Sequence, residues 1–244
     1  MARFWIGTSG WQYDHWRGAF YPPRLPKDAW FGHYKRFFQT VEINNSFYRL
    51  PGRETWRRWH DAAGPDFRYA VKASRYLTHM KRFKDPEEPL RRFLEGAQLL
   101  GETLGPVLFQ APPNFHRTPE NVRRLDAFLA LLRPDRRFAF EFRHASWFGQ
   151  ETLRQLREGR AAFCIYDMPD VECPLAATAG FAYVRFHGAG SAYAGNYPDH
   201  ALQVWADRLS ALAADVDEVW AYFNNDVHGF AVSNALTLKK LLGA

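Results

Sequence analysis

Short apolar or alternating segments recur along the chain, and stretches with helical spacing lie between them. Runs of about 4–8 residues that are apolar, or that alternate apolar and polar positions, predict β-strands. Eight such runs occur, at 3–7, 40–43, 67–72, 105–110, 137–143, 161–166, 181–187 and 218–223. Helical spacing predicts helices at 27–39, 54–63, 87–101, 119–132, 149–158, 199–214 and 230–242. Thr118 followed by Pro119 marks one helix start, and the link after residue 167 has little helical pattern.

Eight strands alternating with helices predict a parallel sheet with right-handed crossovers. The chain has 244 residues, which is the size of a TIM (β/α)8 barrel of about 250 residues. A doubly wound open sheet is the rival fold, but it usually has fewer strands and a G-x-G-x-x-G turn. The GTSG segment at 7–10 lacks that spacing. No repeat, linker or low-complexity tract is visible, so we expect one α/β domain, a TIM barrel, over residues 1–244.

The segment FAFEFRHASW at 138–147 places charges on a predicted strand. Phe138, Phe140 and Phe142 alternate with positions that include Glu141 and Arg143. One face of a barrel strand meets the helices and the other faces the barrel interior. Because large apolar side chains belong against the helices, we expect the phenylalanines to point outward and Glu141 and Arg143 to point into the lumen.

The same parity places further charges in the lumen. The predicted set is Glu42, Lys72, Glu141, Arg143, Arg185 and His187. Burying an unpaired charge costs several kcal/mol, so we expect at least one carboxylate–guanidinium contact within about 4 Å. TIM-barrel interiors are usually filled with branched apolar side chains, so a polar lumen favours a functional site. A structural ion-pair network is the alternative.

More polar residues follow the predicted strands, at the C-terminal face where TIM-barrel sites are built. We expect Glu141, Glu42 and His187 to be the catalytic residues, since differently placed carboxylates can act as acid and base. The expected substrate-binding residues are Ser9, Trp11, Asn44, Lys72, Gln110, Arg143, His144, Asp167, Arg185, Gly188, Asn224 and Asn225.

Charge favours an anionic ligand. Formal net charge is +6, with 47% hydrophobic and 24% charged residues, an ordinary globular balance. Loops after the last two predicted strands, at 187–197 and 224–235, are rich in Gly or Asn. Glycine lets a backbone approach a phosphate closely, and TIM barrels often bind phosphate in these loops. We therefore expect a small anionic ligand, with phosphate esters as one class.

Six motifs resemble the YecE-like family, also called domain of unknown function 72. They are GTSGW (7–11), VEINNSFYRLP (41–51), GPVLFQAPPNF (105–115), FAFEFRHASW (138–147), YVRFHG (183–188) and YFNND (222–226), the last followed by NA at 234–235. They occur in order over essentially the whole chain. The resemblance implies a TIM barrel and no established reaction, so it assigns no catalytic residue.

Other classes of function compete with an enzyme for an anionic substrate. The stretch 75–84 interleaves basic residues with Tyr76 and Phe83, a pattern that can bind nucleic acid; a non-catalytic nucleic-acid-binding protein is the runner-up. Glu42, Glu141, His144, Asp167 and His187 are ligand types for a metal-assisted phosphodiesterase. Since nearby cations oppose a divalent ion, we expect no metal and no cofactor.

Location is inferred from what the sequence lacks. No apolar run approaches the roughly 18 residues of a membrane span, and no secretory leader is visible. Two cysteines, Cys164 and Cys173, cannot form a disulfide framework. We therefore expect a cytoplasmic protein with no membrane partner.

Overall fold

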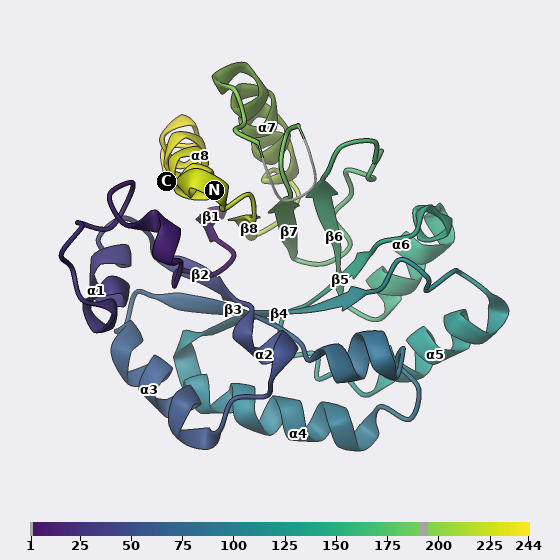
Figure 1. Ribbon diagram of the computed structural model, residues 1–244. Helices are drawn as coiled ribbons and strands as arrows, with labels where there is room; N and C mark the ends of the chain where they lie inside the picture. Colours follow the sequence, from purple (N-terminus) through teal and green to yellow (C-terminus); the bar gives the residue numbers. More distant parts are fainter. Residues whose placement is uncertain (1, 191–194) are drawn as a thin grey trace. The chain divides into compact units, whose positions relative to one another are not determined.

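The computed structural model describes residues 2–190 and 195–244. Eight strands follow one another along the chain (Figure 1): β1 (Arg3–Thr8), β2 (Thr40–Ile43), β3 (Arg68–Lys72), β4 (Leu104–Ala111), β5 (Phe138–Phe142), β6 (Ala162–Asp167), β7 (Phe181–Phe186) and β8 (Glu218–Phe223). Their order is β1-β8-β7-β6-β5-β4-β3-β2, and β1 pairs in parallel with β8. This is the TIM (β/α)8 barrel that the sequence predicted.

Helices connect the strands. The α-helices are α1 (Trp30–Tyr34), α2 (Asn45–Tyr48), α3 (Arg53–Ala63), α4 (Glu87–Ala97), α5 (Pro119–Ala130), α6 (Gln150–Glu158), α7 (Asp199–Leu212) and α8 (Phe230–Leu241). Short 3-10 turns are η1 (Asp14–Trp16), η2 (Lys27–Ala29), η4 (Gln98–Thr103), η5 (Ala145–Trp147) and η6 (Val227–Gly229), and η3 (Tyr76–Met80) is a π-helix. Thr118 caps α5 as predicted, accepting a hydrogen bond from the backbone of Asn121 at 3.2 Å.

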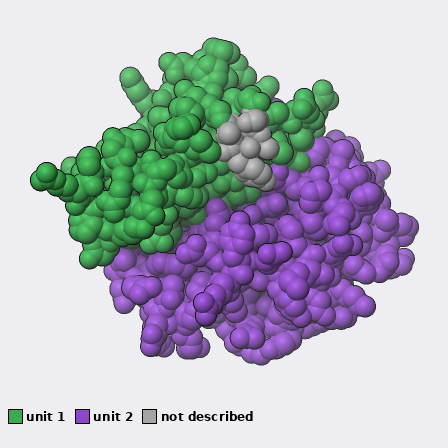
Figure 2. All heavy atoms as spheres, in the orientation of Figure 1, with its two compact units in different colours: residues 1–42, 165–173, 180–244 green, residues 43–164, 174–179 purple. Residues whose placement is uncertain are grey.

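Two compact units divide the chain (Figure 2). Unit 1 comprises Met1–Glu42, Ile165–Cys173 and Gly180–Ala244, and unit 2 comprises Ile43–Cys164 and Pro174–Ala179. Unit 1 holds β1, β7 and β8, whereas unit 2 holds β3, β4 and β5. The single domain expected over residues 1–244 stays a prediction.

The core of unit 2 is aromatic and confirms the strand parity. Phe140 of β5 packs edge-on against Phe128 of α5, with ring centroids 5.9 Å apart. Tyr69 of β3 donates its hydroxyl to the Trp59 carbonyl of α3 at 2.9 Å. Phe140 and Tyr69 therefore face the helices. This leaves Glu141 and Lys72 on the opposite face of their strands.

In unit 1, Phe186 of β7 packs edge-on against Trp205 of α7, with centroids 5.0 Å apart. Arg185 and His187 therefore lie on the other face of β7, as expected. Position 7 of β1 requires glycine because the Thr40 backbone passes close to it. A Cβ at this position would lie 2.4 Å from the Thr40 carbonyl oxygen. The start of β2 is thus held directly against β1.

Two local elements were not predicted from sequence. Helix α2 covers only Asn45–Tyr48, and the π-helix covers Tyr76–Met80. Residues 191–194, part of the Gly-rich loop predicted at 187–197, lie outside the described residues. In the part of the chain that is described, no helix has the length and apolar character needed to cross a membrane.

Candidate functional site

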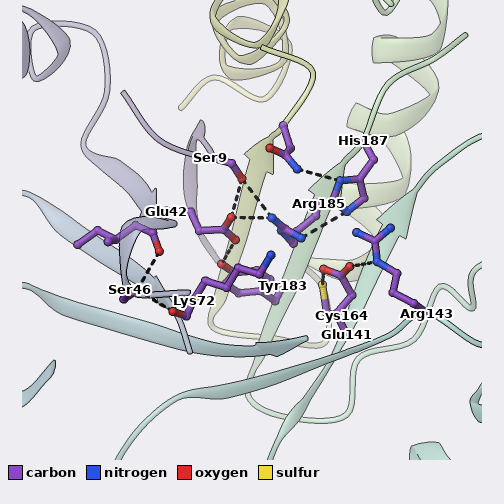
Figure 3. Close-up of polar contacts among 12 residues, drawn as sticks. Ser9, Glu42, Ser46, Lys72, Glu141, Arg143, Cys164, Tyr183, Arg185 and His187 are labelled. Atoms are coloured by element: carbon purple, nitrogen blue, oxygen red, sulfur yellow. Dashed lines mark hydrogen bonds and ion pairs between the residues drawn. The ribbon is translucent and has the colours of Figure 1, made fainter. Parts of the chain in front are cut away.

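Glu42 is the centre of a buried polar cluster in unit 1 (Figure 3). Its Oε1 accepts hydrogen bonds from Ser9 Oγ at 2.6 Å and from Arg185 Nη2 at 2.8 Å, and its Oε2 accepts one from the Tyr183 hydroxyl at 2.7 Å. Glu42 and Arg185 are almost completely buried. Three donors, one of them cationic, stabilise the ionised carboxylate. The expected carboxylate–guanidinium contact is therefore present.

His187 extends this unit 1 cluster. Its Nε2 lies 3.4 Å from Arg185 Nη1, and its Nδ1 lies 3.2 Å from the Asn224 side-chain amide. Both neighbouring groups are N–H donors, and in a neutral imidazole only the nitrogen without a proton can accept from one of them. His187 is thus a buried, oriented base beside a cation.

The remaining predicted residues of unit 1 make structural contacts. Asp167 Oδ2 accepts from Trp205 Nε1 at 3.3 Å. The Gly188 backbone N–H, expected to face an anion, donates to the Tyr197 hydroxyl at 3.1 Å. Asn225 donates to Asn234 Oδ1 at 2.9 Å and to the Gly195 carbonyl at 2.8 Å. These bonds fasten the segment from residue 195 against α8.

Trp11 is buried, at 5% exposure, and packs against Phe31 with ring centroids 5.4 Å apart. Its backbone carbonyl accepts a hydrogen bond from the Tyr21 hydroxyl at 2.5 Å. A ring with so little exposed surface offers no open face for stacking on a ligand. The substrate contact expected of Trp11 stays a prediction.

In unit 2, Glu141 is fully buried and forms an ion pair with Arg143, whose Nε donates to Glu141 Oε1 (Figure 3). The Arg143 side chain is 6% exposed. Cys164 Sγ lies 3.7 Å from Glu141 Oε2. A thiol is a weak donor, and a neighbouring carboxylate disfavours the thiolate. The buried Cys164 thiol therefore lies beside the same carboxylate that pairs with Arg143.

His79 reports the charges around this pair. The pKa of His79 is lowered to about 4, first by burial and then by the cations Lys72, Arg75 and Arg143, against an opposing effect of Glu141. The Lys72 ammonium lies 4.1 Å from the centroid of the Phe47 ring. His79 meets the same ring edge-on, with centroids 4.9 Å apart. Three permanent cations and one carboxylate therefore act on a single imidazole.

Two predicted ligands of unit 2 have buried acceptors without a partner. Gln110 pairs in register with Glu141 on the neighbouring strand, so the two side chains share a face. Its Oε1, like Asn44 Oδ1, is buried and has no hydrogen-bond partner among the described residues. Such atoms cost free energy unless a ligand or water satisfies them.

His144 has a local structural role instead. Its ring stacks on His116 with centroids 3.9 Å apart, and its Nδ1 accepts from the backbone of Ser146 at 3.2 Å, which caps η5. These contacts orient the ring at the end of β5. Binding of a substrate by His144 stays a prediction.

The structure thus joins the predicted residues in two clusters. Ser9, Glu42, Arg185, His187 and Asn224 come together in unit 1, and Lys72, Glu141 and Arg143 come together in unit 2. Their convergence on one lumen stays a prediction. Sequence reasoning did not select Tyr183 or His79. The inward parity of β7 was a signal for Tyr183, whereas His79 lies in the short π-helix Tyr76–Met80, within the stretch 75–84 that had been considered only for nucleic acid.

No three His, Cys, Asp or Glu side chains in the ranges 2–190 and 195–244 are grouped so that they could hold a metal ion. The donor sets found here are instead ion pairs with guanidinium groups. In each cluster a guanidinium stands beside a single carboxylate, whereas a divalent ion is usually held by several oxygen ligands.

The model described as "Protein of unknown function DUF72" matches residues 5–244. The chain belongs to this family. It is 27% identical to the UPF0759 protein YunF of Bacillus subtilis over 98% of this chain and 94% of YunF. It is 28% identical to the UPF0759 protein YecE of Escherichia coli over 48% of this chain and 42% of YecE. The YecE-like resemblance seen in the motifs is therefore confirmed.

Solved structures support the fold of this DUF72 member. A DUF72 family protein of Thermotoga maritima is 30% identical, with a TM-score of 0.91, over 99% of this chain and 100% of that one. More distant similarity, at 10% identity, extends to a D-psicose 3-epimerase of Clostridium cellulolyticum H10, with a TM-score of 0.57 over 99% of this chain and 97% of that one. At this identity the likeness shows the fold alone.

Proposed function

We propose that this DUF72 protein is an enzyme that binds an anionic substrate, such as a phosphate ester, in unit 2 at the C-terminal ends of β3 and β5. The observation that carries the proposal is the set of cations around His79. Lys72 stands over the Phe47 ring that His79 also meets, Arg75 lies four residues before His79, and Arg143 is paired with the one carboxylate, Glu141. Like charges held close together repel one another. An anion in their midst removes that repulsion.

The side chains have different parts in binding. Arg143 keeps 6% of its side chain exposed while its Nε donates to Glu141, and a planar guanidinium matches the geometry of phosphate oxygens. Lys72 supplies a compact charge above the Phe47 ring. Gln110 and Asn44 have buried oxygens that can accept from substrate hydroxyl groups.

Acid–base chemistry is assigned to Glu141. Its carboxylate is shielded from bulk water and kept ionised by Arg143. A carboxylate in that state acts as a base toward water or a substrate hydroxyl. Within unit 1, we assign the same class of chemistry to His187, oriented by Arg185, with Glu42 holding that guanidinium.

Calorimetric titration with inorganic phosphate tests the site. Arg75→Gln, at an exposed position, and Lys72→Gln should each weaken phosphate binding several-fold, because each removes one cation. The matched control is Arg154→Gln, an exposed arginine on α6, which should bind like the wild type. Equal affinities in all three variants would refute the anion site.

Turnover of a generic phosphate ester, p-nitrophenyl phosphate, tests the chemistry separately. Glu141→Gln should retain phosphate binding and lose at least about tenfold in kcat, which corresponds to about 1.4 kcal/mol. A variant that binds and turns over like the wild type would remove Glu141 from the catalytic role and leave the anion site intact.

A further inference from the structure

An exposed aromatic groove adjoins the cation cluster of unit 2. It has a volume of about 470 Å³, and its lining includes Tyr48, Ser74, Tyr76, Leu77 and Arg92. Tyr48 is 72% exposed and Tyr76 is 46% exposed. Aromatic rings of this size usually bury most of their surface. Two exposed tyrosines on one groove are therefore the feature to explain.

Phe47 joins the groove to the anion site. Its ring meets Tyr48 edge-on, with centroids 5.1 Å apart, and meets His79 edge-on at 4.9 Å. The Lys72 ammonium stands over the same ring at 4.1 Å. Ser46 Oγ donates to the Lys72 backbone carbonyl at 2.7 Å, which fixes α2 on the end of β3. One side chain thus separates the phosphate-binding cation from the first exposed tyrosine.

The loop that carries Tyr76 is held in an unusual conformation. It begins with the π-helix Tyr76–Met80, a form that occurs often at functional sites. Arg82, Phe83 and Asp85 then follow with φ of 49°, 60° and 44°. Left-handed conformations of non-glycine residues cost free energy and persist only when the surroundings impose them.

The anchor of this loop is Phe83. Its ring is 1% exposed and packs among Phe115, Phe128 and Phe140, with centroids 5.4, 4.9 and 6.1 Å away. Burial of one aromatic ring contributes enough to offset a strained turn. The loop therefore presents Arg75 and Tyr76 from a fixed backbone.

Charge around the groove is positive. Arg75 and Arg92 are exposed and form no ion pair with any described residue. The carboxylate on the rim, Glu88, is paired with Arg91, whose Nη2 lies 2.6 Å from Glu88 Oε2 and which also pairs with Glu95. Exposed aromatic rings among unpaired arginines are the elements that bind single-stranded nucleic acid, through base stacking and phosphate contacts.

We infer that the substrate bound by this site is single-stranded nucleic acid, with a phosphate at Lys72, Arg75 and Arg143 and neighbouring bases on Tyr48 and Tyr76. The inference rests on the proposed anion site and assigns the substrate class to it. Bases in a duplex stack on each other and leave no face for tyrosine. A single strand is therefore the form that fits the groove.

The decisive probe is a pair of fluorescent strands of equal length, about twelve nucleotides, which is within the usual range of site sizes. One strand carries thymine bases and the other is abasic, so both have the same phosphates. Fluorescence anisotropy should show tighter binding of the thymine strand. A duplex should bind no better than the abasic strand.

Matched variants identify the stacking residues. Tyr48→Ala and Tyr76→Ala should each weaken binding of the thymine strand at least about fivefold, the low end for loss of one stacked base. Neither should alter binding of the abasic strand. Tyr48→Phe and Tyr76→Phe keep the ring and should bind like the wild type. Both positions are exposed, so these variants should fold.

The outcomes separate the two proposals. Equal affinity for thymine and abasic strands, each weakened by Arg75→Gln, would overturn the assignment of bases while the anion site stands. Base-dependent binding of the strand without any binding of phosphate would overturn the anion site while the assignment of bases to the tyrosines stands. A wild type that dimerises in solution, and becomes monomeric as Tyr48→Ala, would overturn the inference by giving the groove another occupant.

Discussion

The two buried carboxylates differ in what surrounds them. Glu42 accepts hydrogen bonds from Ser9, Tyr183 and Arg185, all at most 1% exposed. Glu141 is paired with Arg143, which keeps 6% of its side chain exposed beside a site that we assign to anions. Removing each charge should therefore have different consequences for stability.

We expect Glu42→Gln to lose about 3–5 kcal/mol of unfolding free energy, because it leaves Arg185 as an uncompensated buried charge. Glu141→Gln should lose under about 1.5 kcal/mol, since residues at functional sites are commonly not optimised for stability. Urea denaturation of both variants measures the difference. A loss above about 3 kcal/mol in Glu141→Gln would make that pair structural.

His79 makes the unfolding free energy of the protein sensitive to acid. Burial, together with the nearby cations Lys72, Arg75 and Arg143, lowers the pKa of His79 from 6.5 to about 4 although Glu141 opposes the shift. Between these values the unfolded chain therefore binds a proton that the folded chain does not. Its contribution is fully present above pH 6.5 and is lost as the pH falls toward 4. His79→Asn should therefore show a smaller drop in denaturation midpoint between pH 7 and pH 4 than the wild type.

Parallel curves for the two proteins over that pH range would contradict this assignment. His200→Asn, at an exposed position on α7, serves as the control. It should follow the wild-type curve.

At the scale of elements, the loop between β3 and α4 depends on the anchor at Phe83. Truncation of a buried phenylalanine usually costs about 3–5 kcal/mol. We expect Phe83→Ala to lose stability in that range, whereas Arg82→Ala, at the exposed neighbouring position, should change it by less than about 0.5 kcal/mol. Thermal or urea unfolding measures both. Similar small losses would mean that the core does not hold the loop.

Strands and long helices were predictable because their periodicity repeats over several turns or pleats. Observed β2 (Thr40–Ile43) and β8 (Glu218–Phe223) coincide with the predicted ranges. Helix α2 has four residues, Asn45–Tyr48, too few for a helical period to repeat. The π-helix is followed by Phe83, whose ring packs against Phe115, Phe128 and Phe140, and no local pattern encodes these distant contacts.

The candidate site was predictable in its residue types and in the pairing of its charges. Alternation on β5 placed Glu141 and Arg143 opposite the phenylalanines, and the structure pairs them. Gly188 and Asn225 form hydrogen bonds with Tyr197 and Asn234, each nine residues further along the same predicted loop, and no residue pattern showed that these loops would bond to themselves. Spacing alone could not separate a loop that binds a ligand from one that binds itself.

For the whole molecule, the net charge of +6 favours anions in general, so specificity has to be shown against that background. We expect phosphate to raise the melting temperature more than chloride at matched ionic strength, because a ligand bound to the folded state stabilises it by mass action. Phosphate also stabilises proteins by exclusion from their surface. The informative quantity is thus the difference between the phosphate-induced shifts in melting temperature of the wild type and of Arg75→Gln. Identical shifts in the two proteins would count against specific binding.

The contact of Phe83 with Phe115, Phe128 and Phe140 has a consequence for protein engineering. When a buried aromatic side chain fixes the backbone of a surface loop, substitutions in the core can change the orientation of that loop without altering any exposed residue. Variants with other core residues in place of these phenylalanines would therefore differ in ligand preference as well as in packing. Selection for thermostability alone could shift what the loop recognises.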